Sequence, residues 1–198
     1  TISGVSTAAG GSYSVTATVS GCTSVAATTT VTINETPSSP TAGSNSAVCD
    51  GNTLSLTASV TGATYSWTGP NSFTSTDQNP VIAAITSAGG GTYSVTATSA
   101  EGCTGSAGTT AVIITPLPSA PIAGSNSTVC SGNTLSLTAG AIGGATYSWS
   151  GPNSFTSTLQ NPTIAGVSTD GAGTYSVAAT VSGCTGPAGT VNVSITPP

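Results

Sequence analysis

The chain has 198 residues, of which only 3% are charged, with a formal net charge of −5 and no Lys, Arg or His. An ordinary soluble domain has about 25% charged residues. Without cations, phosphate neutralisation is excluded, and so is nucleic-acid binding as a function. Without His or Lys, the usual general bases and the imidazole metal ligand are also missing. We therefore expect no enzyme, no metal site and no cofactor. The only charged residues are Glu35, Asp50, Asp77, Glu101 and Asp170.

The apolar residues argue against both a membrane span and a disordered chain. Ser, Thr and Gly interrupt every apolar run well before the roughly 20 residues that a spanning helix needs, so we expect no membrane insertion. Val, Ile, Leu, Trp and Tyr recur at regular intervals, whereas disordered chains are depleted in them. The neutral surface that remains, rich in Ser, Thr, Asn and Gly, suits a durable extracellular material.

The chain contains an internal sequence repeat with a period of about 81 residues. Cys22, Cys103 and Cys184 are spaced by 81, each in the phrase GCT, and Cys49 and Cys130 are also 81 apart. Such a period indicates a tandem array. It predicts two complete repeats, residues 37–116 and 117–198. Residues 1–36 match the second half of a repeat, so they form about half a domain.

Within each repeat, apolar and polar residues alternate with a period of two, which indicates strands with one buried face. The alternation is clear at residues 53–57 and again at 190–196. The stretch ATYSWTGPNSFTSTDQNP, residues 63–80, returns almost unchanged at 145–162 and is expected to form a strand, a turn and the next strand. No segment has a helical period. Each complete repeat is therefore predicted to be an all-β sandwich of some seven short strands.

Proline-rich junctions separate the repeats, at TPSSP (36–40) and TPLPSAP (115–121). Because proline fixes φ, such connectors are stiff. We therefore expect the sandwiches to be arranged end to end.

Four phrases occur in order along the chain: VCxGNTLSLTA, TYSWxGPNSFTS, AGTYSV (GGTYSV in the second repeat) and GCT. Together they resemble bacterial immunoglobulin-like repeats, close to the polycystic-kidney-disease type, in large secreted surface proteins of gliding bacteria. The resemblance implies that Trp67 and Trp149 are core tryptophans of strand C. It also implies that Tyr93 and Tyr175 are the tyrosine-corner residues of strand F.

The resemblance further places Ala58 and Val95 where antibody domains have their buried cystine, so that bond is absent and the core depends on apolar packing. The five cysteines of so polar a chain suggest oxidised, extracellular chemistry. Pairing within a repeat would join Cys49 to Cys103 and Cys130 to Cys184, but the implied topology puts these partners at opposite poles, beyond the disulfide limit of about 7 Å.

Three cysteine arrangements therefore stay open. A staggered bond would join Cys49 of one repeat to Cys184 of the next and leave Cys22, Cys103 and Cys130 without partners in these 198 residues. The second arrangement is pairing within each repeat. The third is free thiols or bonds between chains.

The GPNSF turn occurs twice and is the most distinctive loop. It is either a displayed contact surface or a tight turn whose phenylalanine closes the edge of the core, and the second interpretation is favoured. The candidate contact residues are Asn71, Phe73, Asn153 and Phe155.

Two functions fit these observations. The first is a structural segment of an extracellular filament, sheath or stalk, secreted or at the cell surface, whose partners are copies of itself. The alternative is the repeat region of a cell-surface adhesin that binds glycans or other surfaces. Near-identity of the repeats and the lack of charged residues to guard edge strands favour the first. The half domain is expected to be a window from a longer repeat protein, or else to be completed by another copy.

Overall fold

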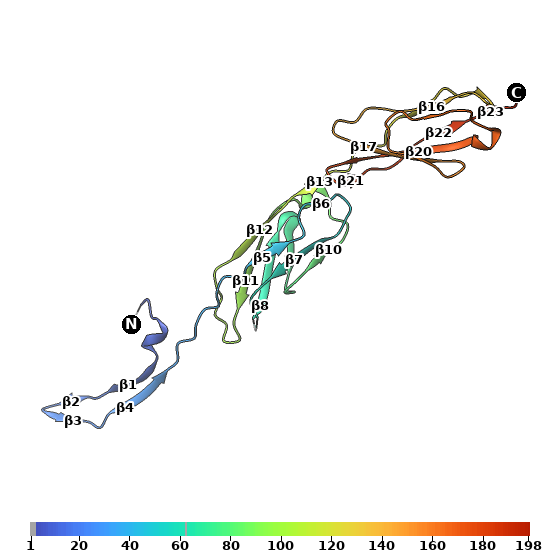
Figure 1. The fold of residues 1–198 in the computed structure, drawn as a ribbon. Helices are drawn as coiled ribbons and strands as arrows, with labels where there is room; N and C mark the ends of the chain where they lie inside the picture. The colour runs from blue at the N-terminus through green and yellow to red at the C-terminus, as the bar shows by residue number, and fades with distance from the viewer. Residues whose placement is uncertain (1–2, 62) are drawn as a thin grey trace. The chain divides into compact units, whose positions relative to one another are not determined.

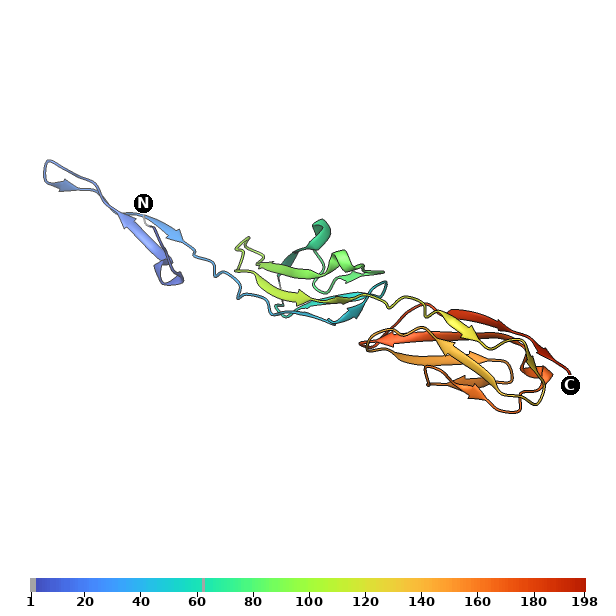
Figure 2. The same ribbon diagram turned by 90° about the horizontal axis from the view of Figure 1, so that it is seen from above.

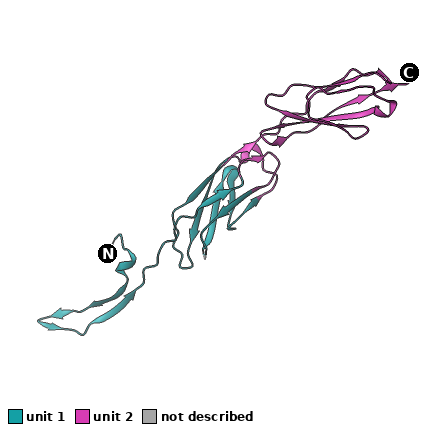
Figure 3. Ribbon diagram, in the orientation of Figure 1, with its two compact units in different colours: residues 1–45, 55–81, 91–111 teal, residues 46–54, 82–90, 112–198 magenta. Residues whose placement is uncertain are grey.

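The computed structural model describes residues 3–61 and 63–198 (Figure 1). Regular structure in these residues consists of β-strands and four short 3-10 turns, at Thr7–Ala9, Pro70–Ser72, Ser87–Gly89 and Thr169–Gly171. Contacts between Cα atoms divide the chain into two compact units (Figure 3). The first comprises residues 1–45, 55–81 and 91–111, and the second comprises 46–54, 82–90 and 112–198.

The larger part of the second unit is a sandwich formed by the third predicted repeat. One sheet has the order β14-β16-β19, and the other has the order β18-β17-β20-β22, with β21 paired to the end of β20. The short strand β15 pairs in parallel with β23. The strands are β14 Ala123–Ser125, β15 Val129–Cys130, β16 Leu135–Ala139, β17 Thr146–Gly151, β18 Phe155–Ser157, β19 Thr163–Ile164, β20 Gly173–Val181, β21 Cys184–Thr185, β22 Gly189–Val193 and β23 Ile195–Thr196.

This pairing is immunoglobulin-like. In the order of each sheet, β14, β16 and β19 correspond to strands A, B and E, and β18, β17, β20 and β22 correspond to strands C′, C, F and G. The all-β, immunoglobulin-like prediction is therefore confirmed. The two-residue period predicted from the sequence has its physical origin here, because each strand presents every second side chain to the facing sheet.

The core of this sandwich is apolar and closely packed. Trp149 is 1% exposed and packs with the leucines of β16 and with the alternate residues of β20. Burying an aromatic side chain of 150–250 Å² at 25 cal/mol per Å² contributes about 4–6 kcal/mol before the entropy of ordering it is subtracted. The buried cluster consists of Val129, Leu135, Leu137, Ala139, Tyr147, Trp149, Val167, Tyr175, Val177, Ala179 and Val193.

Two hydrogen bonds and one close ring contact lie at the edges of this core. The Trp149 indole Nε1 donates to the Gln160 carbonyl at 3.2 Å. The buried Tyr175 hydroxyl donates to the Gly171 carbonyl at 2.9 Å, four residues upstream, which is the tyrosine-corner arrangement. Its ring lies against Gly151, where an added Cβ would collide with it. A side chain is therefore excluded at Gly151.

The remainder of the second unit includes a short parallel pair. Strand β6, Val48–Cys49, pairs with β13, Ile114–Thr115, in the register Thr115 opposite Cys49. One period later, β15 and β23 repeat this pair with Thr196 opposite Cys130. The two pairs are thus the same structural element in consecutive repeats.

The first unit contains most strands of the second predicted repeat, and their pairing repeats that of the third. The two sheets have the orders β10-β7-β5 and β12-β11-β8-β9. Trp67 and Val95 are 0% exposed, and the Trp67 indole Nε1 donates to the Gln78 carbonyl at 3.3 Å. The strands are β5 Ala42–Ser44, β7 Leu54–Ala58, β8 Thr64–Gly69, β9 Phe73–Ser75, β10 Val81–Ile82, β11 Gly91–Thr98 and β12 Gly108–Val112.

The first unit also contains an N-terminal hairpin, drawn in blue in Figure 2. Strand β1, Gly11–Val15, pairs antiparallel with β4, Ala27–Val31, in a two-stranded sheet. Strands β2, Thr18–Val19, and β3, Cys22–Thr23, extend it toward the turn. Every residue of these four strands is exposed.

Candidate functional site: the cysteine joint and the GPNSF turns

Ionisable groups form no cluster in the described part of the chain. Four of the five carboxylates are exposed, and Asp50 is half-buried. No group of three or more His, Cys, Asp or Glu residues that could hold a metal ion is found in residues 3–61 and 63–198. Burial raises the pKa of Tyr93 and of Tyr175 above the ordinary value, which keeps both phenols neutral in the core. These tyrosines are therefore structural groups.

The most specific chemical feature is a disulfide between Cys49 and Cys184, with a Cα–Cα distance of 5.6 Å and a sequence separation of 135 residues. It lies within the second unit and joins the second predicted repeat to the third. The Cα distance is that of an ordinary disulfide. This is the staggered pairing. The alternative of pairing within each repeat is wrong, because Cys49 and Cys184 are bonded to each other. Cys103 and Cys130, which would be their partners within the repeats, are free thiols.

The two cysteines are presented by different local structures. Cys49 ends β6, where the backbone pairs with Thr115 and the Asp50 amide donates to the Thr115 carbonyl at 2.9 Å. Cys184 begins β21, directly after a two-residue turn in which Ser182 and Gly183 have φ of 50° and 80°. Two successive positive φ values are typical of a type I′ hairpin turn. The turn thus delivers Cys184 to the Cys49 strand, and Cys184 is buried there.

The proline linker adds a second constraint near this disulfide. Pro118 and Pro121 lie against the start of β22 so closely that an added Cβ at Gly186 or Gly189 would collide with a proline carbonyl. In the first unit, the carbonyls of Pro37 and Pro40 lie equally close to Gly105 and Gly108. Each linker is therefore held along its own repeat. These glycines were not predicted from the sequence, although the G-x-x-G spacing at 105–108 and 186–189 recurs in both complete repeats and indicates them.

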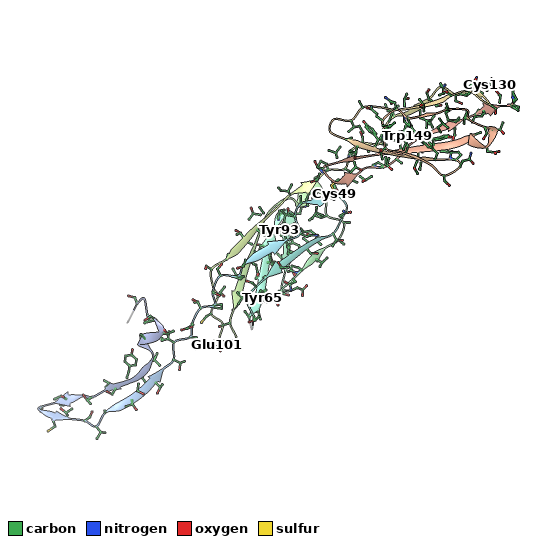
Figure 4. All side chains as sticks on the ribbon, viewed as in Figure 1. Cys49, Tyr65, Tyr93, Glu101, Cys130 and Trp149 are labelled. Carbon is green, nitrogen blue, oxygen red and sulfur yellow. A yellow bond between two sulfur atoms is a disulfide. The ribbon has the colours of Figure 1, made fainter. Side chains whose placement is uncertain are left out.

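Three cysteines are free thiols in the described residues: Cys22 and Cys130 are exposed, and Cys103 is partly exposed. Cys130 ends β15 as Cys49 ends β6, and it is labelled in Figure 4. Thr196 Oγ1 lies 3.6 Å from the Cys130 sulfur. Cys22 follows a Ser20–Gly21 turn with φ of 50° and 83°, which matches the turn before Cys184. Both thiols thus occupy positions that form the disulfide elsewhere in the chain.

The GPNSF turns expose their asparagines and partly bury their phenylalanines. Asn71 and Asn153 are exposed, each with φ of 53°, in the left-handed region. Phe73 packs edge-on against the Tyr93 ring with centroids 5.5 Å apart, and Phe155 packs against Tyr175 at 5.6 Å. The phenylalanines therefore close the edge of the core. Only the asparagines and their neighbouring serines are available for an external contact.

The expected core residues lie inside the two sandwiches. Trp67, Trp149, Tyr93 and Tyr175 are each no more than 1% exposed. Figure 4 shows Trp149 and Tyr93 among the side chains of their own sandwiches. An exposed ring that could stack on a ligand is not found at any of these four positions.

Comparison with known proteins gives no family for this chain: no family model matches, and no curated protein matches. Solved structures with immunoglobulin domains are similar at low identity. The eight N-terminal domains of the Down syndrome cell adhesion molecule share 15% identity, with a TM-score of 0.48, covering 96% of this chain and 28% of that one. A titin I-band fragment, I67–I69, shares 12% identity, with a TM-score of 0.45, covering 97% and 76%.

A third similar structure is that of the three N-terminal domains of the outer capsid protein Hoc of bacteriophage RB49. It shares 19% identity, with a TM-score of 0.42, covering 79% of this chain and 59% of that one. No role is transferred from these proteins at such values. In addition, none of the helices in the described residues is long and apolar enough to cross a membrane.

Proposed function

We propose that the chain is a structural segment of an extracellular filament, sheath or stalk, built from tandem immunoglobulin-like domains. The observation that carries this proposal is the Cys49–Cys184 disulfide, which joins two consecutive repeats. Together with the peptide linker, it makes two covalent connections across one joint. Two separate connections remove rotations that a single flexible linker allows. A joint of this kind suits a protein whose function is mechanical.

The disulfide also supports the proposed location outside the cytosol. Structural disulfides form and persist in oxidising compartments and are rare where thiol reductants are abundant. Cys184, at one end of the bond, is 3% exposed, and Cys49 at the other end is partly buried. We therefore propose a secreted or cell-surface protein.

Association with further copies of the chain is supported by the edges of the sheets. In the third repeat the edge strands are β14, β18, β19 and β22, and none contains a charged residue. Solitary proteins usually protect such edges with charges, above all with Lys. Neutral edges of this composition favour lateral pairing between copies.

The alternative, an adhesin that binds surface glycans, is supported by a different observation. The same turn presents an exposed asparagine in both complete repeats, at Asn71 and Asn153. Amide side chains are suitable donors and acceptors for sugar hydroxyl groups. The turn has, however, a sufficient structural role through Phe73 and Phe155.

Electron microscopy of the native, unreduced protein distinguishes the two functions. Long regular fibres with a domain-scale repeat are the expected result. The matched control is the same material after reduction, in which we expect irregular, bent fibres because the joint has lost one connection. Isolated rods that bind to a glycan array, and lose that binding in the Asn71→Ala, Asn153→Ala double variant, would replace the filament with the adhesin.

A further inference from the structure

The N-terminal hairpin exposes an apolar face. Val5, Tyr13, Val15 and Val31 are 47%, 41%, 68% and 37% exposed. The register of β1 and β4 puts Tyr13 opposite Thr29 and Val15 opposite Ala27, so these side chains share one side of the sheet. An exposed patch of large apolar side chains on a small element marks an interaction surface.

The counterparts of these residues in the third repeat are buried. A constant offset of 162 residues relates Tyr13, Val15 and Val31 to Tyr175, Val177 and Val193, since 175 − 13, 177 − 15 and 193 − 31 are all 162. The later three are 1%, 0% and 4% exposed. Val5 corresponds in the same way to Val167, which is 5% exposed. The strands are thus equivalent in sequence, and only their covering differs.

In the third repeat this face is covered by the sheet that contains β14 and β16, while β17 pairs beside β20 in the same sheet and contributes Trp149 to the covered side. Leu135 and Leu137 of β16 and Trp149 of β17 belong to the same buried cluster as Tyr175, Val177 and Val193. These strands form the first half of the repeat, and the hairpin corresponds to the second half. The structure therefore shows which side chains fit this face.

We propose that the apolar face of the hairpin binds a polypeptide segment with the sequence pattern of residues 123–162. The segment lays its B strand over Tyr13, Val15 and Val31, pairs its C strand with the free edge of β1, and completes an immunoglobulin-like sandwich. This interaction is donor-strand complementation between two halves of one repeat. It does not depend on whether the completed protein forms a filament.

Two shallow hollows on this face have the right lining for the incoming side chains. One of about 270 Å³ is lined by Val5, Ala9, Tyr13, Val31 and Ile33. Another of about 190 Å³ is lined by residues of β1 and β4, including Tyr13, Val15 and Ala27. Both linings are dominated by apolar and small side chains, as the leucines and the tryptophan of the donated strands require.

A cysteine provides an independent indication of the same partner. The Cys103 sulfur lies 3.9 Å from the Asn34 carbonyl, at the end of the hairpin. Asn34, Thr115 and Thr196 occupy the same position in successive repeats, at a spacing of 81 residues. Thr115 pairs with Cys49, and Thr196 pairs with Cys130. The donated segment would thus bring its own cysteine beside Asn34. There it can form with Cys103 the bond that Cys49 forms with Cys184.

One feature of the hairpin limits which segment can bind. Ser24 and Ala27 stand where the third repeat has Gly186 and Gly189, at which any Cβ would collide with Pro118 or Pro121. A linker with prolines at those positions cannot approach the hairpin as closely. The binding segment is therefore expected to begin after the prolines, which sets the start of the probe at Ala123.

The first test supplies the segment as a separate polypeptide of residues 123–162. The recipient is the full 198-residue chain with Cys22→Ser and Cys130→Ser, so that Cys103 is its single free thiol. The two are mixed in a glutathione redox buffer. A disulfide forms between Cys103 and the cysteine of the polypeptide, and the disulfide of oxidised glutathione breaks. The two thiols together give up two protons and two electrons, and these convert one oxidised glutathione into two reduced molecules. We expect a link to Cys103, located by peptide mapping, to form at least tenfold faster than with a Val15→Asp recipient.

A matched control keeps the cysteine of the probe and removes its apolar residues, with Leu135→Ser and Leu137→Ser in the polypeptide. If this control links to Cys103 as fast as the original, docking on the apolar face does not direct the reaction and the proposal is overturned. Equal rates for the Val15→Asp recipient would overturn it too.

A second measurement keeps the proposal testable if the free polypeptide aggregates. Residues 123–162 are fused in front of Thr1 of the full chain, and amide hydrogen exchange of residues 11–15 is followed by mass spectrometry. We expect exchange at least tenfold slower than in the unfused chain, with residues 173–177 unchanged as an internal reference. Equal exchange of residues 11–15 in the two chains would show that the segment does not cover the hairpin.

Discussion

The β1–β4 pair and the β20–β22 pair occupy equivalent positions in their repeats and have the same antiparallel register, yet the apolar side of one is exposed and that of the other is buried. GSYSV in β1 corresponds to GTYSV in β20. Val15 is 68% exposed, and its counterpart Val177 is 0% exposed. The strand pattern therefore determines which side of the sheet is apolar. The facing sheet determines whether that side is buried.

The difference also separates local from non-local stabilisation. The Tyr13 hydroxyl donates to the Ala9 carbonyl at 2.7 Å, as the Tyr175 hydroxyl does to Gly171 at 2.9 Å. This contact between nearby residues forms with or without a second sheet. Burial of the tyrosine ring requires strands that are distant in the sequence. Matched substitutions in the two hairpins can therefore measure what the facing sheet contributes.

The largest effect is expected from a charge in the core. Val177→Asp places a carboxylate among apolar side chains with no cation in the whole chain to pair with it, so we expect the third repeat to lose more than about 3 kcal/mol of unfolding free energy. Val15→Asp on the exposed hairpin should change stability by less than about 0.5 kcal/mol. Urea denaturation followed by tryptophan fluorescence measures both. A similar loss in both variants would contradict the assigned burial.

The disulfide gives the second comparison, between Cys184→Ser and its counterpart Cys22→Ser. Loss of the Cys49–Cys184 bond is expected to lower the stability by about 2–4 kcal/mol, the usual contribution of a disulfide. Cys22 is an unpaired, exposed thiol, so its substitution should be neutral. Thermal unfolding with and without reductant provides the check. If the reductant lowers the melting temperature of Cys184→Ser as much as that of the parent, the bond is not the source of the stability.

The linker contact is tested by Gly189→Ala. The new Cβ would meet the backbone of Pro121, so the linker has to shift, and we expect a loss of about 1–3 kcal/mol. The hairpin already has Ala27 at this position, and Ala27→Gly should cost no more than about 1 kcal/mol, the entropic penalty of a glycine. Denaturation midpoints compare the two variants. An unchanged midpoint for Gly189→Ala would mean that the linker is not held there.

The smallest effect is expected at the tyrosine corner. Tyr175→Phe removes a buried hydrogen bond and should cost about 0.5–1.5 kcal/mol, whereas Tyr13→Phe on the exposed hairpin should cost less. Differential scanning calorimetry at neutral pH measures the two values. Equal losses would show that the second sheet adds nothing to this contact.

The same tyrosine predicts a pH dependence. Burial raises the pKa of Tyr175 above its unfolded value near 10, so the folded state holds the phenolic proton more tightly. Its stabilisation is complete below about pH 10 and is lost as the pH rises through the folded pKa. Tyr175→Phe should reduce the alkaline loss without abolishing it, because the pKa of Tyr93 is raised in the same way. A variant with an undiminished alkaline loss would contradict this cause.

The strands, the sandwich and the burial of Trp67 and Trp149 could be predicted because they follow from local patterns repeated along the chain. A two-residue period indicates a strand with one apolar side, and an 81-residue period indicates that the unit recurs. For the GPNSF turns, the sequence left two interpretations open, a displayed contact surface and a tight turn that closes the core. Whether Phe73 points toward Tyr93 or toward solvent depends on the backbone of the turn, in which Asn71 takes a left-handed conformation.

By itself, the sequence determined the repeat, the all-β class and the apolar side of each strand, since these depend on neighbouring residues and on chain geometry. Only the tertiary structure decided the partner of Cys49, the close approach of Pro121 to Gly189 and the exposure of Val15. Each of these depends on a distance between residues far apart in the chain. Such distances are set by how sheets and linkers pack, and strands at equivalent positions of the repeat can therefore have different surroundings.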